Sequence, residues 1–114
     1  MNTIKISIFS LLLIMSTAVF ADNYPPTRTY EVLVREVRLP STDGGTITVR
    51  ECDRCNYETH RVTARTTYAL NGKYMSLEDF REVIDELRLE VGHVVNVRHD
   101  IQTGTITQVF VYTQ

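Results

Sequence analysis

The sequence predicts a mainly β fold, a small barrel of five antiparallel strands with one helix between the third and fourth strands. Apolar and polar residues alternate over five stretches between Thr29 and Tyr112, as in strands that bury one face. A single stretch, residues 77–87, instead repeats apolar residues at the spacing of an amphipathic helix. A change of phase inside the first stretch indicates that the sheet curls.

The first predicted strand, Thr29–Leu39, changes its buried face part way along. Its apolar residues occupy even positions from Tyr30 to Val34 and odd positions from Val37 onward. Because side chains alternate with period two, a slip of one residue moves the apolar set to the other face unless the strand is bulged. A bulged first strand allows a sheet to close toward a barrel.

The second and third strands form a predicted hairpin. Residues 40–45 are rich in Pro, Ser, Asp and Gly, which is typical of a turn. Thr46–Cys52 then alternates apolar and polar residues, and Glu58–Leu70 places its even-numbered residues from His60 onward on one face. Threonine and β-branched residues suit half-buried strands.

A helix is expected after the Asn71-Gly72 turn. Ser76 is a suitable N-cap, with Asp79 in the first turn. The residues at helical spacing are Leu77, Phe80, Val83, Ile84 and Leu87. The helix is predicted to end between Arg88 and Gly92. Val94–His99 and Thr105–Tyr112 then form the fourth and fifth strands, a second hairpin.

Three strands, a helix and two strands is the order of the OB barrel. With the 63–76 stretch and the Gly92-His93-Val94-Val95 start of the fourth strand, the chain resembles the small exported OB-fold-like domains of bacteria, many of them uncharacterised. The resemblance covers Tyr30–Tyr112 and implies one OB-like domain. An open antiparallel α+β sheet with one packed helix is the alternative fold.

The N-terminus has the pattern of an export signal. Lys5 precedes an apolar run from Ile6 to Met15, and Val19-Phe20-Ala21 offers a cleavage site near Ala21. The run is too short for a spanning helix, which needs about 20 residues. We therefore expect a signal peptide (1–21), an extended lead-in (22–28) and a single domain (29–114), located in the periplasm or secreted, with no membrane span in the mature protein.

The charge balance does not favour a nucleic-acid partner. The chain has 12 basic and 14 acidic residues, and Lys5 leaves with the signal. A net negative protein has no global attraction to polyanions, so any anion site must be local. Tyr30, Tyr57 and Tyr74 offer stacking surfaces but are not closely interleaved with basic residues as in single-strand binding sites. The expected partner is an anionic ligand or a periplasmic protein.

Cys52 and Cys55 are the only cysteines and are predicted to form a disulfide, as is usual for paired cysteines in exported proteins. A redox-active pair is one alternative, because a Cys-x-x-Cys motif can hold a low-pKa thiolate. A metal site using Cys52, Cys55 and His60 is another, with His93 or His99 as a further ligand. No complete metal motif is present, so no cofactor is expected.

A polar face on the second and third strands is the predicted ligand surface. Its residues are Arg50, Arg61, Thr63, Arg65 and Thr67. OB domains bind oligonucleotides and oligosaccharides around these strands, and arginines spaced along one side suit an extended anion. The alternative is a solvated face whose arginines pair with Glu51 and Glu58.

No arrangement of nucleophile and base emerges from the sequence, and Gly44-Gly45 is only a turn. The predicted function is therefore a non-catalytic, exported binding module. A thiol-disulfide redox protein and a metal-binding protein, both through Cys52 and Cys55, are the alternatives.

Overall fold

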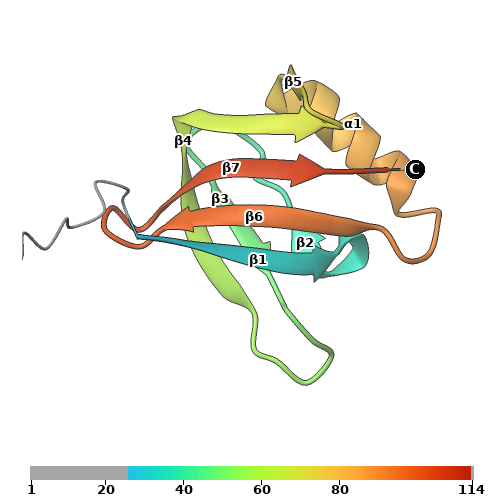
Figure 1. Cartoon of the computed structure of the whole chain (residues 1–114), viewed down its shortest axis with the longest axis horizontal. Helices are drawn as coiled ribbons and strands as arrows, with labels where there is room; N and C mark the ends of the chain where they lie inside the picture. Colours follow the sequence, from blue (N-terminus) through green and yellow to red (C-terminus); the bar gives the residue numbers. More distant parts are fainter. Residues whose placement is uncertain (1–25, 114) are drawn as a thin grey trace, which may run out of the picture.

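The structure is a computed structural model that describes residues 26–113, in which one curled sheet packs against one helix (Figure 1). The sheet forms a half-barrel, so the mainly β prediction is confirmed. Its strands are β1 (Thr27–Leu33), β2 (Val37–Arg38), β3 (Thr46–Val49), β4 (Glu58–Leu70), β5 (Lys73–Met75), β6 (Val94–Asp100) and β7 (Thr105–Val111). The helix α1 (Leu77–Leu87) lies between β5 and β6.

The described residues contain seven strands, and the predicted number of five is wrong for two reasons. A 3-10 turn, η1 (Val34–Glu36), divides the first predicted strand into β1 and β2 where the apolar phase slips. The extra strand β5 pairs with β4 through the Asn71-Gly72 turn. Both turn residues have positive φ, 52° and 82°, as a tight two-residue hairpin requires.

The sheet has the strand order β1-β6-β7-β4-β3-β2, with β5 added beside β4. Strands β4 and β7 are parallel, and the other pairs are antiparallel. The two ends of this order, β1 and β2, follow each other in the chain. The sheet therefore curls back toward itself.

Aliphatic side chains from all sides of the curl fill its interior, and α1 covers one end. Leu77, Phe80 and Ile84 are the buried residues of α1, and the Phe80 ring lies 5.4 Å from that of Tyr68 on β4. Ser76 caps the helix by accepting a hydrogen bond from the Asp79 amide at 3.1 Å. The predicted cap and helical face are thus both present.

Strand β4 contains an irregularity that its alternating sequence does not predict. Its pairing with β7 shifts register between Val62 and Thr67. Thr66 is buried there, whereas Ala64, expected on the inner face, is exposed. The Thr66 hydroxyl donates to the Ile106 carbonyl at 2.6 Å and accepts from the Thr63 amide at 3.0 Å. A polar side chain thus replaces the missing ladder hydrogen bonds.

Some sequence-based predictions lie partly outside the described residues. The signal segment, 1–21, and residues 22–25 of the lead-in are not described, and β1 begins at Thr27 rather than Thr29. No helix within residues 26–113 is long and apolar enough to cross a membrane.

Candidate functional site

The outward side of β2, β3 and β4 gathers basic, hydroxyl and aromatic side chains on one surface. Strand pairing places Arg38 opposite Thr48, Thr48 opposite Thr59, and Thr46 opposite Arg61. The Thr48 and Thr59 hydroxyls lie 3.0 Å apart, which confirms that they share a side. We call this surface the arginine face, defined by Arg38, Thr46, Thr48, Arg50, Tyr57, Thr59 and Arg61.

Arg50, predicted as a ligand-binding residue, is held in an ion pair with Glu36. Its Nη2 and Nε atoms lie 2.7 and 2.8 Å from Glu36 Oε2. The hydrogen bond from Arg50 lowers the pKa of the Glu36 carboxyl below its ordinary value, although partial burial opposes this. The charge of the Arg50 guanidinium is therefore already paired with Glu36 and is not free to pair with a ligand.

Tyr57 joins two of the arginines. The guanidinium carbon of Arg50 lies 4.6 Å from the centre of the Tyr57 ring, and that of Arg38 lies 5.5 Å from it. Both distances are within the range of cation–π attraction. Tyr57 is still 47% exposed, so its ring is available for contact with a ligand.

Arg38, Arg61 and Arg65 are exposed, and none of them forms an ion pair within residues 26–113. Arg38 and Arg61 are two strand spacings apart, or about 10 Å across the sheet. The acids that the sequence suggested as partners lie elsewhere. Glu51 pairs with Arg28, and Glu58 lies beside His60.

The other predicted site residues belong to the irregular part of β4. The Arg65 amide donates to the Thr63 hydroxyl at 3.1 Å, and the Thr67 hydroxyl donates to the Thr107 carbonyl at 3.4 Å. The structure thus brings Arg50 and Arg61 onto one face with Arg38 and Tyr57, while the Thr63 and Thr67 hydroxyls have contacts within the fold.

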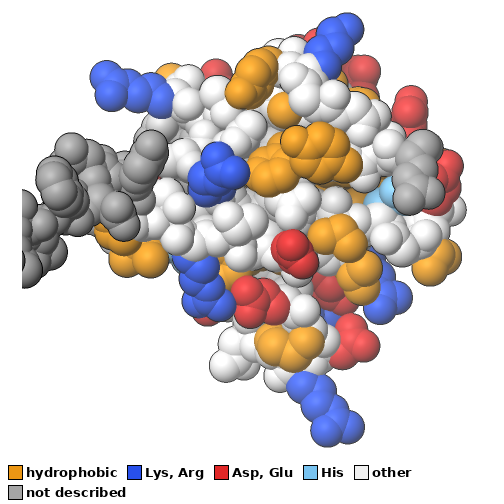
Figure 2. Space-filling view, viewed as in Figure 1, with side chains coloured by type: hydrophobic (Ala, Val, Ile, Leu, Met, Phe, Trp, Pro, Cys, Tyr) orange, Lys and Arg blue, Asp and Glu red, His pale blue; other side chains and the backbone are white. Residues whose placement is uncertain are grey.

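The face formed by β1, β6 and β7 has a different character (Figure 2). Basic and acidic side chains are interspersed on it around several hydrophobic side chains. The exposed apolar residues here include Leu33 on β1, Val94 on β6 and Tyr112 directly after β7. Arg98 on β6 also forms no ion pair within residues 26–113, but its guanidinium donates a hydrogen bond to the Gln108 side chain at 3.2 Å and lies 5.6 Å from the centre of the Phe110 ring.

A second polar cluster lies inside the curl, next to the cysteine loop. His60 pairs with Ile47 across the hairpin and so points inward, where its ring lies 4.3 Å from that of His99 and 5.3 Å from that of Tyr30. We call Tyr30, His60 and His99 the ring cluster. The sequence suggested His60 and His99 together only as metal ligands, and it did not predict their packing with Tyr30, because the three residues come from β1, β4 and β6.

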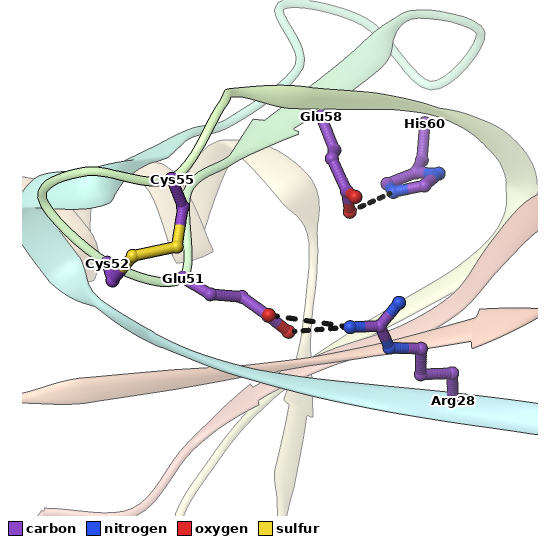
Figure 3. A network of polar contacts seen from close by, with 6 residues as sticks. All are labelled: Arg28, Glu51, Cys52, Cys55, Glu58 and His60. Carbon is purple, nitrogen blue, oxygen red and sulfur yellow. Dashed lines mark hydrogen bonds and ion pairs between the residues drawn. A yellow bond between two sulfur atoms is a disulfide. The ribbon is translucent and has the colours of Figure 1, made fainter.

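Charged residues lie near His60, the one member of the ring cluster that Figure 3 draws. Arg28 pairs with Glu51 at 3.2 Å, linking β1 to the loop after β3, and Glu58 lies 3.6 Å from His60. Burial lowers the pKa of His60, and the neighbouring His99 lowers it further, while Glu58 opposes both. His60 therefore favours its neutral form.

Cys52 and Cys55 form a disulfide, with their α-carbons 5.0 Å apart, in the loop that joins β3 to β4 (Figure 3). The Cys55 amide also donates to the Cys52 carbonyl at 3.1 Å, so the bridge closes a tight turn. The loop joins two strands, whereas low-pKa cysteines are favoured at helix N-termini. The two sulfur atoms are bonded to each other in the structure.

The alternative metal site needs at least three ligating side chains close together. Within residues 26–113 no group of three or more metal-ligating side chains could hold an ion.

Comparisons of the chain with protein-family models, with curated proteins and with solved structures find no match.

Proposed function

We propose that the protein is a non-catalytic, extracytoplasmic binding module that takes an extended anionic ligand on the arginine face. The disulfide between Cys52 and Cys55 suits an oxidising compartment, and the export signal predicted for residues 1–21 would deliver the chain there.

The observation that carries this proposal is the set of unpaired, exposed arginines on one side of a sheet in a net acidic protein. A guanidinium presents a planar fork of donors that matches carboxylate, sulfate and phosphate groups. Arg38 and Arg61 lie far enough apart to contact successive anionic groups of one chain. Tyr57, whose ring both Arg38 and Arg50 approach and which stays 47% exposed, adds a ring surface against which a sugar or an aliphatic segment packs.

The topology supports the same surface. We infer an OB-like barrel in which β1 and β2 act as one interrupted strand, because β1 pairs with β6 while β2 pairs with β3. In OB barrels the surface around the second and third strands binds oligonucleotides and oligosaccharides. Strands β3 and β4 take those positions in this chain.

The test is a double variant, Arg38→Ala with Arg61→Ala, and a labelled heparin hexasaccharide as a linear polyanionic probe. Each exposed charge contact contributes up to about 1 kcal/mol, so we expect roughly tenfold weaker binding by fluorescence anisotropy. The control, Lys73→Ala with Arg98→Ala, removes the same charge from β5 and β6.

Equal loss of affinity in the two double variants would mean that only net charge matters, and the arginine face would then be the wrong site. Failure of the wild-type protein to bind the hexasaccharide even at low salt would reject a linear anionic ligand of this kind.

A further inference from the structure

An acidic cavity of about 830 Å³ lies between the turn at residues 41–43, strand β4 and helix α1, and no residue of the arginine face lines it. Its charged residues are Asp43, Glu78, Glu82 and Asp85, with Arg81 as the one base in the lining. Four carboxylates against one guanidinium make the lining of the cavity net negative, which favours cations.

The helix aligns three of these carboxylates in a row. Positions 78, 82 and 85 are four and then three residues apart, so they share one face of α1 and span about 10 Å along its axis. Glu78 and Glu82 form no ion pair in the part of the chain that the structure describes, and Asp85 pairs with Arg88 at 3.4 Å. The row is therefore largely uncompensated.

Tyr68 supplies an independent observation that points to a ligand in this cavity. Its side chain lines the cavity and is only 3% exposed, yet its hydroxyl has no hydrogen-bond partner among residues 26–113. Burial, together with the charge of Asp43, raises the pKa of Tyr68 to about 12, so the hydroxyl stays protonated. Buried polar groups without partners are rare in proteins and destabilising.

We propose that this cavity binds a linear aliphatic polyamine. Its ammonium groups pair with the carboxylates of Glu78, Glu82 and Asp43, and one ammonium donates a hydrogen bond to the Tyr68 hydroxyl oxygen. A polyamine fits better than a single metal ion, because within residues 26–113 no three potential metal-ligating side chains are close enough to hold one. The volume is also that of a small-molecule site.

The experiment measures spermidine binding to the full protein by isothermal titration calorimetry. We expect Glu78→Gln with Glu82→Gln to weaken binding by roughly tenfold, the effect of two exposed charge contacts. The control, Glu31→Gln with Glu86→Gln, makes the same change of charge outside the cavity and should bind like the wild type. Magnesium chloride that supplies the same concentration of positive charge as the spermidine should not displace it.

Tyr68→Phe separates a ligand contact from a structural role. Removing a buried hydroxyl that has no partner should leave the thermal unfolding temperature unchanged or higher, while spermidine affinity falls several-fold. The proposal is overturned if spermidine does not bind the wild type, if magnesium displaces it, or if the control double variant loses as much affinity as Glu78→Gln with Glu82→Gln. Unchanged affinity in Tyr68→Phe would also overturn it.

Discussion

Thr66→Val tests whether one hydroxyl maintains the irregular middle of β4. Valine keeps the shape of the threonine side chain but removes its hydroxyl, which donates to the Ile106 carbonyl at 2.6 Å and accepts from the Thr63 amide at 3.0 Å. Thr66 is buried, so water cannot readily replace either contact. The substitution should therefore leave two backbone groups without partners at one point of the sheet.

The expected loss follows from those two contacts. A typical hydrogen bond contributes about 1 kcal/mol net, and a buried group left without a partner is destabilised by about 1–3 kcal/mol. The Thr63 amide is only partly buried, so the lower part of the range applies to it. We expect Thr66→Val to reduce the free energy of unfolding by roughly 2–4 kcal/mol, a large fraction of the about 5–15 kcal/mol usual for a domain.

Urea denaturation followed by circular dichroism measures this loss as a lower midpoint with an unchanged slope. The matched control is Thr67→Val, because Thr67 is exposed and its hydroxyl lies 3.4 Å from the Thr107 carbonyl. Its effect should stay within about 0.5 kcal/mol. If Thr66→Val were as stable as Thr67→Val, the irregularity would be maintained by strand pairing alone and the reasoning would be refuted.

Two further predictions concern the ring cluster and the helix cap. The folded-state pKa of His60 lies below its unfolded value of about 6.5, so the unfolded state binds the proton more readily and stability should fall as pH decreases from about 7 to 5. His60→Gln should make the stability measured by urea titration depend less on pH. If the variant showed the same pH dependence as the wild type, burial beside His99, Tyr30 and Glu58 would not disfavour protonation of His60. Ser76→Ala should reduce stability by about 1 kcal/mol through loss of the α1 cap, whereas Ser76→Asp, which keeps an acceptor, should retain most of it; equal losses in both variants would argue against the cap.

The parts of the fold that depend on neighbours in the chain could be predicted from the sequence. The helix followed from its apolar spacing and from Ser76, and β4 has the predicted bounds, Glu58–Leu70, because a long threonine-rich alternation is a local signal. The change of apolar phase after Val34 predicted where the first strand is interrupted, but not which kind of interruption occurs there. A one-residue bulge and a 3-10 turn both shift the alternation, and the sequence alone does not separate them.

The polar contacts could not be predicted in the same way. Arg50 bonds to Glu36, 14 positions away, although Glu51 and Glu58 are closer in sequence. Strand pairing determines which glutamate Arg50 contacts. The pairing of β2 with β3 brings residues 36 and 50 together, and the Arg50 amide donates to the Glu36 carbonyl at 3.1 Å. Contacts of this kind depend on register, and a single sequence carries no direct record of register.

Strand β4 connects the two proposed sites. Arg61 lies on the arginine face before the irregularity, and Tyr68 lines the acidic cavity after it. Positions 61 and 68 are seven residues apart, so the ordinary alternation of side chains along a strand turns Arg61 outward and Tyr68 inward. The two surfaces approach each other at the end of α1, where Arg38 of the arginine face and Asp85 of the acidic cavity line one small pocket together with Arg88. Asp85 pairs there with Arg88 at 3.4 Å, and no ion pair joins it to Arg38 within residues 26–113.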